Sequence, residues 1–144
     1  MKRLLAMTVV AGSLVASAAL SDESKSLVTV VTTAEPQTQL MAMVLTMQAA
    51  KQGATPHVLL CGPAGDIALK SAPDTVTAGQ PPMDVSPQKL MMGILKQPGA
   101  KIEVCALYLP GKAAKADVLL DGIGVAKPGE MAGALLAADA RLSF

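Results

Sequence analysis

The 144-residue chain has almost no aromatic side chains: Tyr108 and Phe144 are the only two, and tryptophan is absent. A hydrophobic core must therefore consist of Leu, Val, Ile, Ala and Met. The lysines are scattered singly, which excludes the clustered basic face of a nucleic-acid-binding protein. Residues 62–65 are too short for a phosphate-binding loop and lack its GK[ST] ending. With His57 as the only histidine, neither a zinc site nor a Ser-His-Asp catalytic set is expected.

The N-terminus has the three-part pattern of a secretory signal peptide. Lys2 and Arg3 precede an apolar run at residues 4–15, and residues 16–18 (Ala-Ser-Ala) offer small side chains for cleavage. The run is too short to span a bilayer. The alternatives are a membrane anchor or an ordinary first helix. We expect residues 1–18 to be removed and the mature chain, from Ala19, to be periplasmic with a net charge of about −1.

Residues 19–144 alternate between strand-like and helix-like segments, which indicates a single three-layer α/β domain. The strand-like runs are almost continuously apolar, as in a parallel sheet covered on both faces. Residues 71–85 contain three prolines and no periodic pattern, and are expected to form a long loop. The expected strands are 27–33, 57–61, 101–105, 123–126 and 141–144, and the expected helices are 36–52, 66–70, 86–96, 112–120 and 128–138.

The first long helix, at residues 36–52, is apolar on more than one face. Met41, Met43 and Leu45 extend its apolar surface beyond the stripe set by the helical period. Such a helix needs a second covering surface, which another subunit would supply. We therefore expect a homo-oligomer.

Methionine is frequent, and thioethers together with thiolates suit Cu(I), so copper binding is a third possible function. The simpler interpretation is that methionine fills a core without aromatic residues. The methionines concerned are Met41, Met43, Met47, Met83, Met91 and Met92.

Five segments, in order and spacing, carry a resemblance to a known family. They are LVTVVTT at 27–33, the Met-rich helix, HVLLCG at 57–62, VCALYL at 104–109 and ALLAADARLSF at 134–144. With them the chain resembles the DsrE/DsrF-like proteins of sulfur relay over essentially its whole mature length. The resemblance implies about five mostly parallel strands, assembly into trimers or hexamers, and a persulfide carried on Cys105. Relay members work in the cytoplasm, whereas this chain carries an export-like start.

Cys105 is the candidate catalytic residue because it ends a strand, and reactive groups gather at the carboxyl ends of strands in open α/β sheets. If a helix begins after it, backbone N–H groups would lower the pKa of its thiol. The alternative is a buried, inert cysteine. Candidate accessory residues are Cys61, Thr33, Tyr108 and Lys112, the last as a nearby positive charge.

Cys61 also ends a strand, and two cysteines in an exported protein ordinarily form a disulfide. In the flavodoxin-like strand order 2-1-3-4-5, however, the second and third strands lie on either side of the first. Their separation of about 9–10 Å exceeds the ~7 Å limit between bridged Cα atoms. We therefore expect no simple disulfide, although the loop ends could bring the sulfurs closer. His57 would head its strand at the end opposite the cysteines, as a surface or capping residue.

The sequence thus predicts an exported protein that handles sulfur or thiols, with Cys105 accepting a persulfide from a donor protein or passing it to an acceptor protein. It predicts no cofactor, no nucleic-acid partner and no membrane association after cleavage. The alternative, from a different class, is a non-catalytic oligomeric module that binds a small ligand or a partner protein on the same fold. A reactive, accessible Cys105 would favour the first, and a buried thiol would favour the second.

Overall fold

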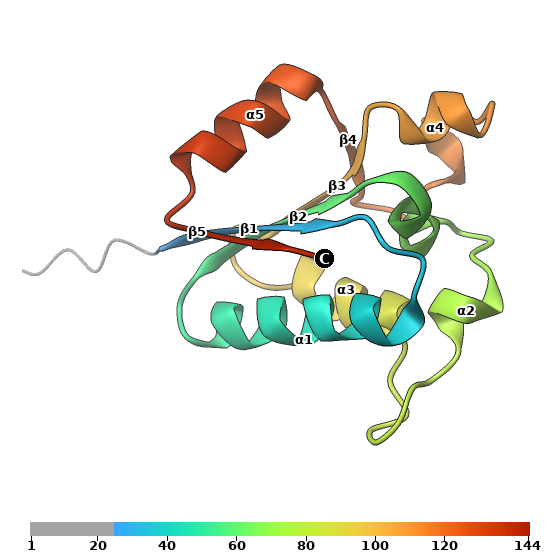
Figure 1. The fold of residues 1–144 in the computed structure, drawn as a ribbon, viewed down its shortest axis with the longest axis horizontal. Helices are drawn as coiled ribbons and strands as arrows, with labels where there is room; N and C mark the ends of the chain where they lie inside the picture. The colour runs from blue at the N-terminus through green and yellow to red at the C-terminus, as the bar shows by residue number, and fades with distance from the viewer. Residues whose placement is uncertain (1–24) are drawn as a thin grey trace, which may run out of the picture.

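The computed structural model describes residues 25–144, which form a five-stranded, entirely parallel sheet flanked by helices (Figure 1). The predicted signal segment, residues 1–18, lies outside the described residues. The strands are β1 (Ser26–Val31), β2 (Thr55–Leu60), β3 (Lys101–Cys105), β4 (Gly124–Ala126) and β5 (Ala140–Ser143).

Helices cover both faces of this sheet, so the prediction of a single three-layer α/β domain is confirmed. In Figure 1, α1 (Pro36–Lys51) and α3 (Pro87–Leu95) lie together on one face, and α5 (Pro128–Ala137) lies on the other. None of the helices within residues 25–144 is long and apolar enough to cross a membrane. The short helices are η1 (Gly62–Ala68), α2 (Asp74–Thr77), α4 (Tyr108–Gly111) and η2 (Ala116–Val118).

The strand order is β4-β3-β2-β1-β5, and the predicted order 2-1-3-4-5 is wrong. From β1 to β4 the chain always moves in the same direction across the sheet. Right-handed crossovers then place α1 and α3 on the same face, where they pack against each other. The last connection returns across the whole sheet, which sends α5 over the opposite face and leaves β5 beside β1. The consequence is that β2 and β3 are direct neighbours.

The two faces of the sheet carry cores of unequal size. The larger core lies between the sheet and the pair α1 and α3, and it consists mainly of aliphatic residues and methionine, as predicted from the scarcity of aromatics. The smaller core lies under α5. It is formed by Val28, Leu59, Cys105, Ala126 and Ala138, and no residue within α5 itself is buried. The α5 face of the sheet is therefore the more thinly covered one.

Capping and proline signals locate the long helices well. Glu35 accepts hydrogen bonds from the backbone N–H groups of Gln37 and Thr38 at the start of α1. At the start of α3, Ser86 Oγ accepts a hydrogen bond from the backbone N–H of Lys89 at 3.1 Å. Side-chain oxygens at these positions satisfy N–H groups that have no partner within the helix.

Two local predictions need correction. Residues 112–120 do not form one helix; the chain makes the short α4 before them and a single 3-10 turn, η2, within them. Met43 does not face outward from α1 but is fully buried in the larger core, whereas Met41 is 52% exposed and Leu45 is 42% exposed. The loop at residues 71–85 is largely irregular, but it contains the one-turn helix α2 and a bridge between Gln80 and Val85.

Candidate functional site

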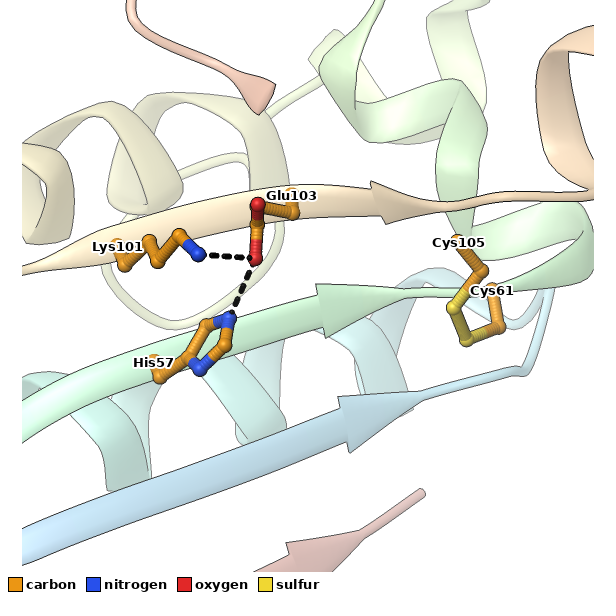
Figure 2. A network of polar contacts seen from close by, with 5 residues as sticks. All are labelled: His57, Cys61, Lys101, Glu103 and Cys105. Atoms are coloured by element: carbon orange, nitrogen blue, oxygen red, sulfur yellow. Dashed lines mark hydrogen bonds and ion pairs between the residues drawn. A yellow bond between two sulfur atoms is a disulfide. The ribbon is translucent and has the colours of Figure 1, made fainter. Parts of the chain in front are cut away.

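Cys61 and Cys105 form a disulfide bond at the carboxyl ends of β2 and β3 (Figure 2). The parallel register pairs Leu60 with Val104, so the next residue on each strand is a cysteine and the two stand side by side. Their Cα atoms are 4.9 Å apart, about one strand spacing and well within the range for disulfides. The prediction of no disulfide is therefore wrong, because it followed from a strand order that separates β2 from β3.

The disulfide lies on the α5 face of the sheet and is only partly covered. Cys105 is 8% exposed and belongs to the smaller core, and Cys61 packs against that core while keeping more of its surface accessible. After Cys105, two residues intervene before α4 begins at Tyr108, whereas η1 begins directly after Cys61. A helix start directly after a cysteine, considered above for Cys105, is thus found at Cys61.

A cavity of about 600 Å³ opens beside the disulfide, between the segment that follows β3 and the first turns of α5. No charged side chain lines it. Leu107, which also lines it, is 83% exposed. The disulfide is therefore reached through an apolar opening. The residues that define its walls are Cys61, Cys105, Leu107, Tyr108, Met131 and Leu135.

Tyr108 connects this cavity to a polar group behind it. Its hydroxyl donates a hydrogen bond to Asp66 Oδ1 at 2.7 Å, and Lys112 Nζ pairs with the same oxygen at 2.6 Å. Lys112 also lies 5.4 Å from the centre of the Tyr108 ring. Burial, then the hydrogen bond to Asp66 and its negative charge, raise the pKa of Tyr108. Tyr108 is thus a neutral side chain held in one position.

The ring of Tyr108 packs directly over Gly65 in η1. A Cβ atom built on Gly65 would lie 2.6 Å from Tyr108 Cγ, closer than real Cβ contacts come. Only glycine leaves room for the ring at this place. The cavity wall formed by Tyr108 therefore depends on Gly65, which lies in the segment that follows Cys61.

Not all predicted accessory residues reach the site. Cys61 and Tyr108 line the same cavity as Cys105. Lys112 directs its charge to Asp66 rather than to the cysteines. Thr33 belongs to the start of α1: its hydroxyl accepts from Glu35 N at 3.0 Å, and its carbonyl accepts from the Gln39 side chain at 2.8 Å.

A second polar group lies on the same face, towards the amino ends of β2 and β3 (Figure 2). Glu103 is 5% exposed, and its Oε2 atom is 2.8 Å from His57 Nε2 and 3.0 Å from Lys101 Nζ. Residues 101, 103 and 105 alternate to one side of β3, which places this carboxylate two residues before Cys105. His57 lies at the end opposite the cysteines, as expected, but it is half-buried and bonded to Glu103. Sequence reasoning missed Glu103, although a lone acid within the apolar run IEVC was the available signal.

Within residues 25–144, no group of three or more His, Cys, Asp or Glu side chains is arranged to hold a metal ion. Met43 and Met91 are fully buried in the larger core and Met47 is nearly so, which accounts for them as packing residues. The chemically distinctive feature of the described chain is therefore the disulfide beside its apolar cavity.

Comparison with known proteins identifies the fold. No protein-family model matches the chain, and no curated protein matches it in sequence. Solved structures do match, and among them are two proteins of dissimilar sequence that share this α/β fold. One is YchN from E. coli, at a TM-score of 0.66 and 17% identity, over 84% of this chain and 99% of that chain. The other is MTH1491 from Methanobacterium thermoautotrophicum, a protein of unknown function, at a TM-score of 0.59 and 10% identity, over 85% of this chain and 100% of that chain. The chain has the DsrE-like fold, and this part of the prediction is confirmed.

Proposed function

We propose that this protein is an exported DsrE-like protein that handles sulfur or thiols, with Cys105 as the residue that accepts sulfane sulfur. The observation that carries the proposal is the Cys61–Cys105 disulfide on the wall of an apolar cavity at the carboxyl ends of two central strands. Ligands and reactive groups gather at this end of an open α/β sheet. The DsrE-like fold supports the same class of function.

The disulfide is the oxidised form of the site, so sulfur transfer begins with its reduction. A thiolate from a reductant attacks one sulfur, and a second thiol completes the exchange to leave Cys61 and Cys105 as thiols. The Cys105 thiolate then attacks the outer sulfur of a persulfide R–S–SH. The S–S bond of the donor breaks, R–S⁻ leaves, and Cys105 carries the new persulfide.

A disulfide also supports the proposed periplasmic location, because such bonds persist in oxidising compartments and are rare in the cytosol. Together with the signal-like residues 1–18, this favours export. Protein recovered from the periplasm should have an intact mass that lacks residues 1–18. Recovery of the full-length chain from the cytoplasm would contradict this part of the proposal.

The test of sulfur acceptance uses single-cysteine variants, so that no disulfide can form within the chain. The Cys61→Ser variant is incubated with glutathione persulfide and then analysed by mass spectrometry. We expect the peptide that contains Cys105 to gain one sulfur atom. The matched control is Cys105→Ser, which measures the sulfur that Cys61 accepts without Cys105. A Cys61→Ser variant that acquires no sulfur, or only glutathione, would refute the proposal.

The second candidate is a non-catalytic binding module, and the burial of Cys105 favours it. In that case the cavity binds an apolar ligand and the disulfide only braces its wall. Iodoacetamide labelling of the reduced protein across a range of pH separates the two functions. A reactive Cys105 should label faster than an ordinary thiol with a pKa of about 8.5. Labelling only after unfolding would favour the binding module.

We also propose that the protein assembles into a homo-oligomer, a trimer or hexamer, through the outer face of α1. This face and the loop at 80–85 enclose a second cavity of about 560 Å³ with mostly apolar walls. Met41, 52% exposed, and Met83, 78% exposed, both line it. A second copy of the chain would remove this apolar surface from water.

A further inference from the structure

The two cysteines of the disulfide differ in their exposure to solvent and in their place in the fold. Cys105 is the last residue of β3 and is 8% exposed, while Cys61 follows β2 and retains more accessible surface. The backbone register holds them side by side whether or not the bond is present, because the ladder from His57↔Lys101 to Leu60↔Val104 is independent of it. Reduction therefore leaves two thiols in one place, with no chain movement needed to rejoin them.

We propose that Cys61 resolves the persulfide formed on Cys105, so that the protein releases its cargo as sulfide and returns to the disulfide form. This inference rests on the proposed function, since it requires Cys105 to accept sulfur first. It assigns Cys61 a catalytic role, that of attacking nucleophile. It also makes the protein a persulfide reductase that consumes reducing equivalents, in place of a carrier that passes sulfane sulfur onward.

The chemical step balances within the site. The Cys61 thiolate attacks the Cys105 Sγ atom of Cys105–Sγ–SH, and the bond between Sγ and the outer sulfur breaks. That sulfur leaves as HS⁻ with the bonding electron pair. The two cysteine sulfurs are oxidised to the disulfide, and the sulfane sulfur is reduced to sulfide. The overall reaction converts R–S–SH and the dithiol protein to R–SH, H₂S and the disulfide protein.

The structure favours attack on the inner sulfur over transfer of the outer one. The product of inner attack is the Cys61–Cys105 bond itself, which the structure contains with the Cα atoms 4.9 Å apart. Groups held at such proximity react as if at very high concentration. An external thiol acceptor, by contrast, must enter through the apolar cavity to reach a cysteine that is 8% exposed. Resolution by Cys61 therefore outpaces transfer to a partner.

The cycle requires a reductant, and its chemical class follows from the product. A dithiol, or two equivalents of a monothiol, must reduce the Cys61–Cys105 disulfide, and the reductant leaves as its own disulfide.

The test compares reduced wild-type protein with Cys61→Ser after one addition of glutathione persulfide, without free reductant. The measured quantities are the intact mass and the sulfide released. We expect the wild type to release about one sulfide per chain and to lose two hydrogens as the disulfide forms. Cys61→Ser should retain the added sulfur and release sulfide at least about tenfold more slowly than the wild type. Cys105→Ser measures the sulfide that arises without the acceptor.

The outcomes separate this inference from the proposed function. If the wild type and Cys61→Ser both keep a stable persulfide and release no sulfide, Cys61 does not resolve it and sulfur acceptance still stands. A persulfide that moves to Cys61 would likewise overturn the inference, because it would mark a relay between the two cysteines. If neither protein takes up sulfur, the proposed function fails and the inference fails with it. Far-UV circular dichroism of each variant confirms that it is folded.

Discussion

Gly65→Ala should destabilise the protein through a single steric contact with Tyr108. The new Cβ atom would lie 2.6 Å from Tyr108 Cγ, and the ring is 5% exposed with its hydroxyl bonded to Asp66. Overpacking of a core costs about 1–3 kcal/mol. A ring that moves away also weakens a hydrogen bond to a charged partner, a contact that contributes about 1.5–3 kcal/mol. We expect a total loss of about 3 kcal/mol in the free energy of unfolding.

Urea denaturation of the oxidised protein, followed by far-UV circular dichroism, measures this loss. In a thermal scan a loss of that size should lower Tm by about 10 °C. The matched control is Gly133→Ala on α5, where an added Cβ meets nothing within 4 Å. Alanine should stabilise that helix by about 0.5–1 kcal/mol, because glycine is unfavourable inside a helix. The two glycine substitutions therefore have opposite signs.

A double variant identifies the ring as the cause. Tyr108→Leu removes the aromatic atoms that the new Cβ would meet, so Gly65→Ala should cost at least about 1 kcal/mol less in that background. If Gly65→Ala changes stability by less than ~0.5 kcal/mol in the wild-type background, Tyr108 is not held in place as described. An equal cost in both backgrounds would show that the strain arises from the backbone of η1.

Three further predictions address other parts of the molecule. Replacing Cys61 and Cys105 by alanine should lower the free energy of unfolding by about 4 kcal/mol, the chain-entropy value for the sequence separation of 44 residues. Urea denaturation should give the same loss for the double variant and for the reduced wild type. A loss under ~1 kcal/mol would contradict this prediction. Asp139 accepts hydrogen bonds from the backbone N–H and the hydroxyl of Ser26, which lower its pKa from the ordinary 3.8. The stability that these bonds contribute is therefore present above pH 3.8 and is lost as pH falls through the lower folded-state pKa. Asp139→Asn should abolish this part of the pH dependence of stability in acid titrations. Met41→Glu should dissociate the proposed oligomer without unfolding the chain, as measured by light scattering, and a wild-type monomer at micromolar concentration would refute the interface.

Local features of the fold were predictable because they depend on local chemistry. Pro36 and the Ser86–Pro87 pair located the starts of α1 and α3 to within a residue, since capping and the fixed φ of proline act within one turn. Near-continuous apolar runs correctly indicated a parallel sheet with both faces covered. These signals depend only on neighbouring residues, and tertiary packing did not override them.

The order of the strands was not predictable in the same way, because it is set by which direction each connection takes across the sheet. Placing β2 on the far side of β1, instead of between β1 and β3, was enough to separate Cys61 from Cys105. The burial of Met43 also depends on how α1 packs in the larger core, which no local pattern specifies. Glu103 is stabilised by His57 from the neighbouring strand, so its burial became evident only once that strand pairing was known.

Tyr108 is the only tyrosine, and the chain contains no tryptophan. Since it lines the same cavity as the disulfide, all of the protein's useful ultraviolet fluorescence originates beside the Cys61–Cys105 bond. Disulfides quench tyrosine emission at short range, so breaking the Cys61–Cys105 bond should brighten the protein and reforming it should dim it again. The molecule thus carries an optical indicator of its own redox state, and each cycle of reduction and reoxidation can be followed in a stopped-flow cell without any attached label.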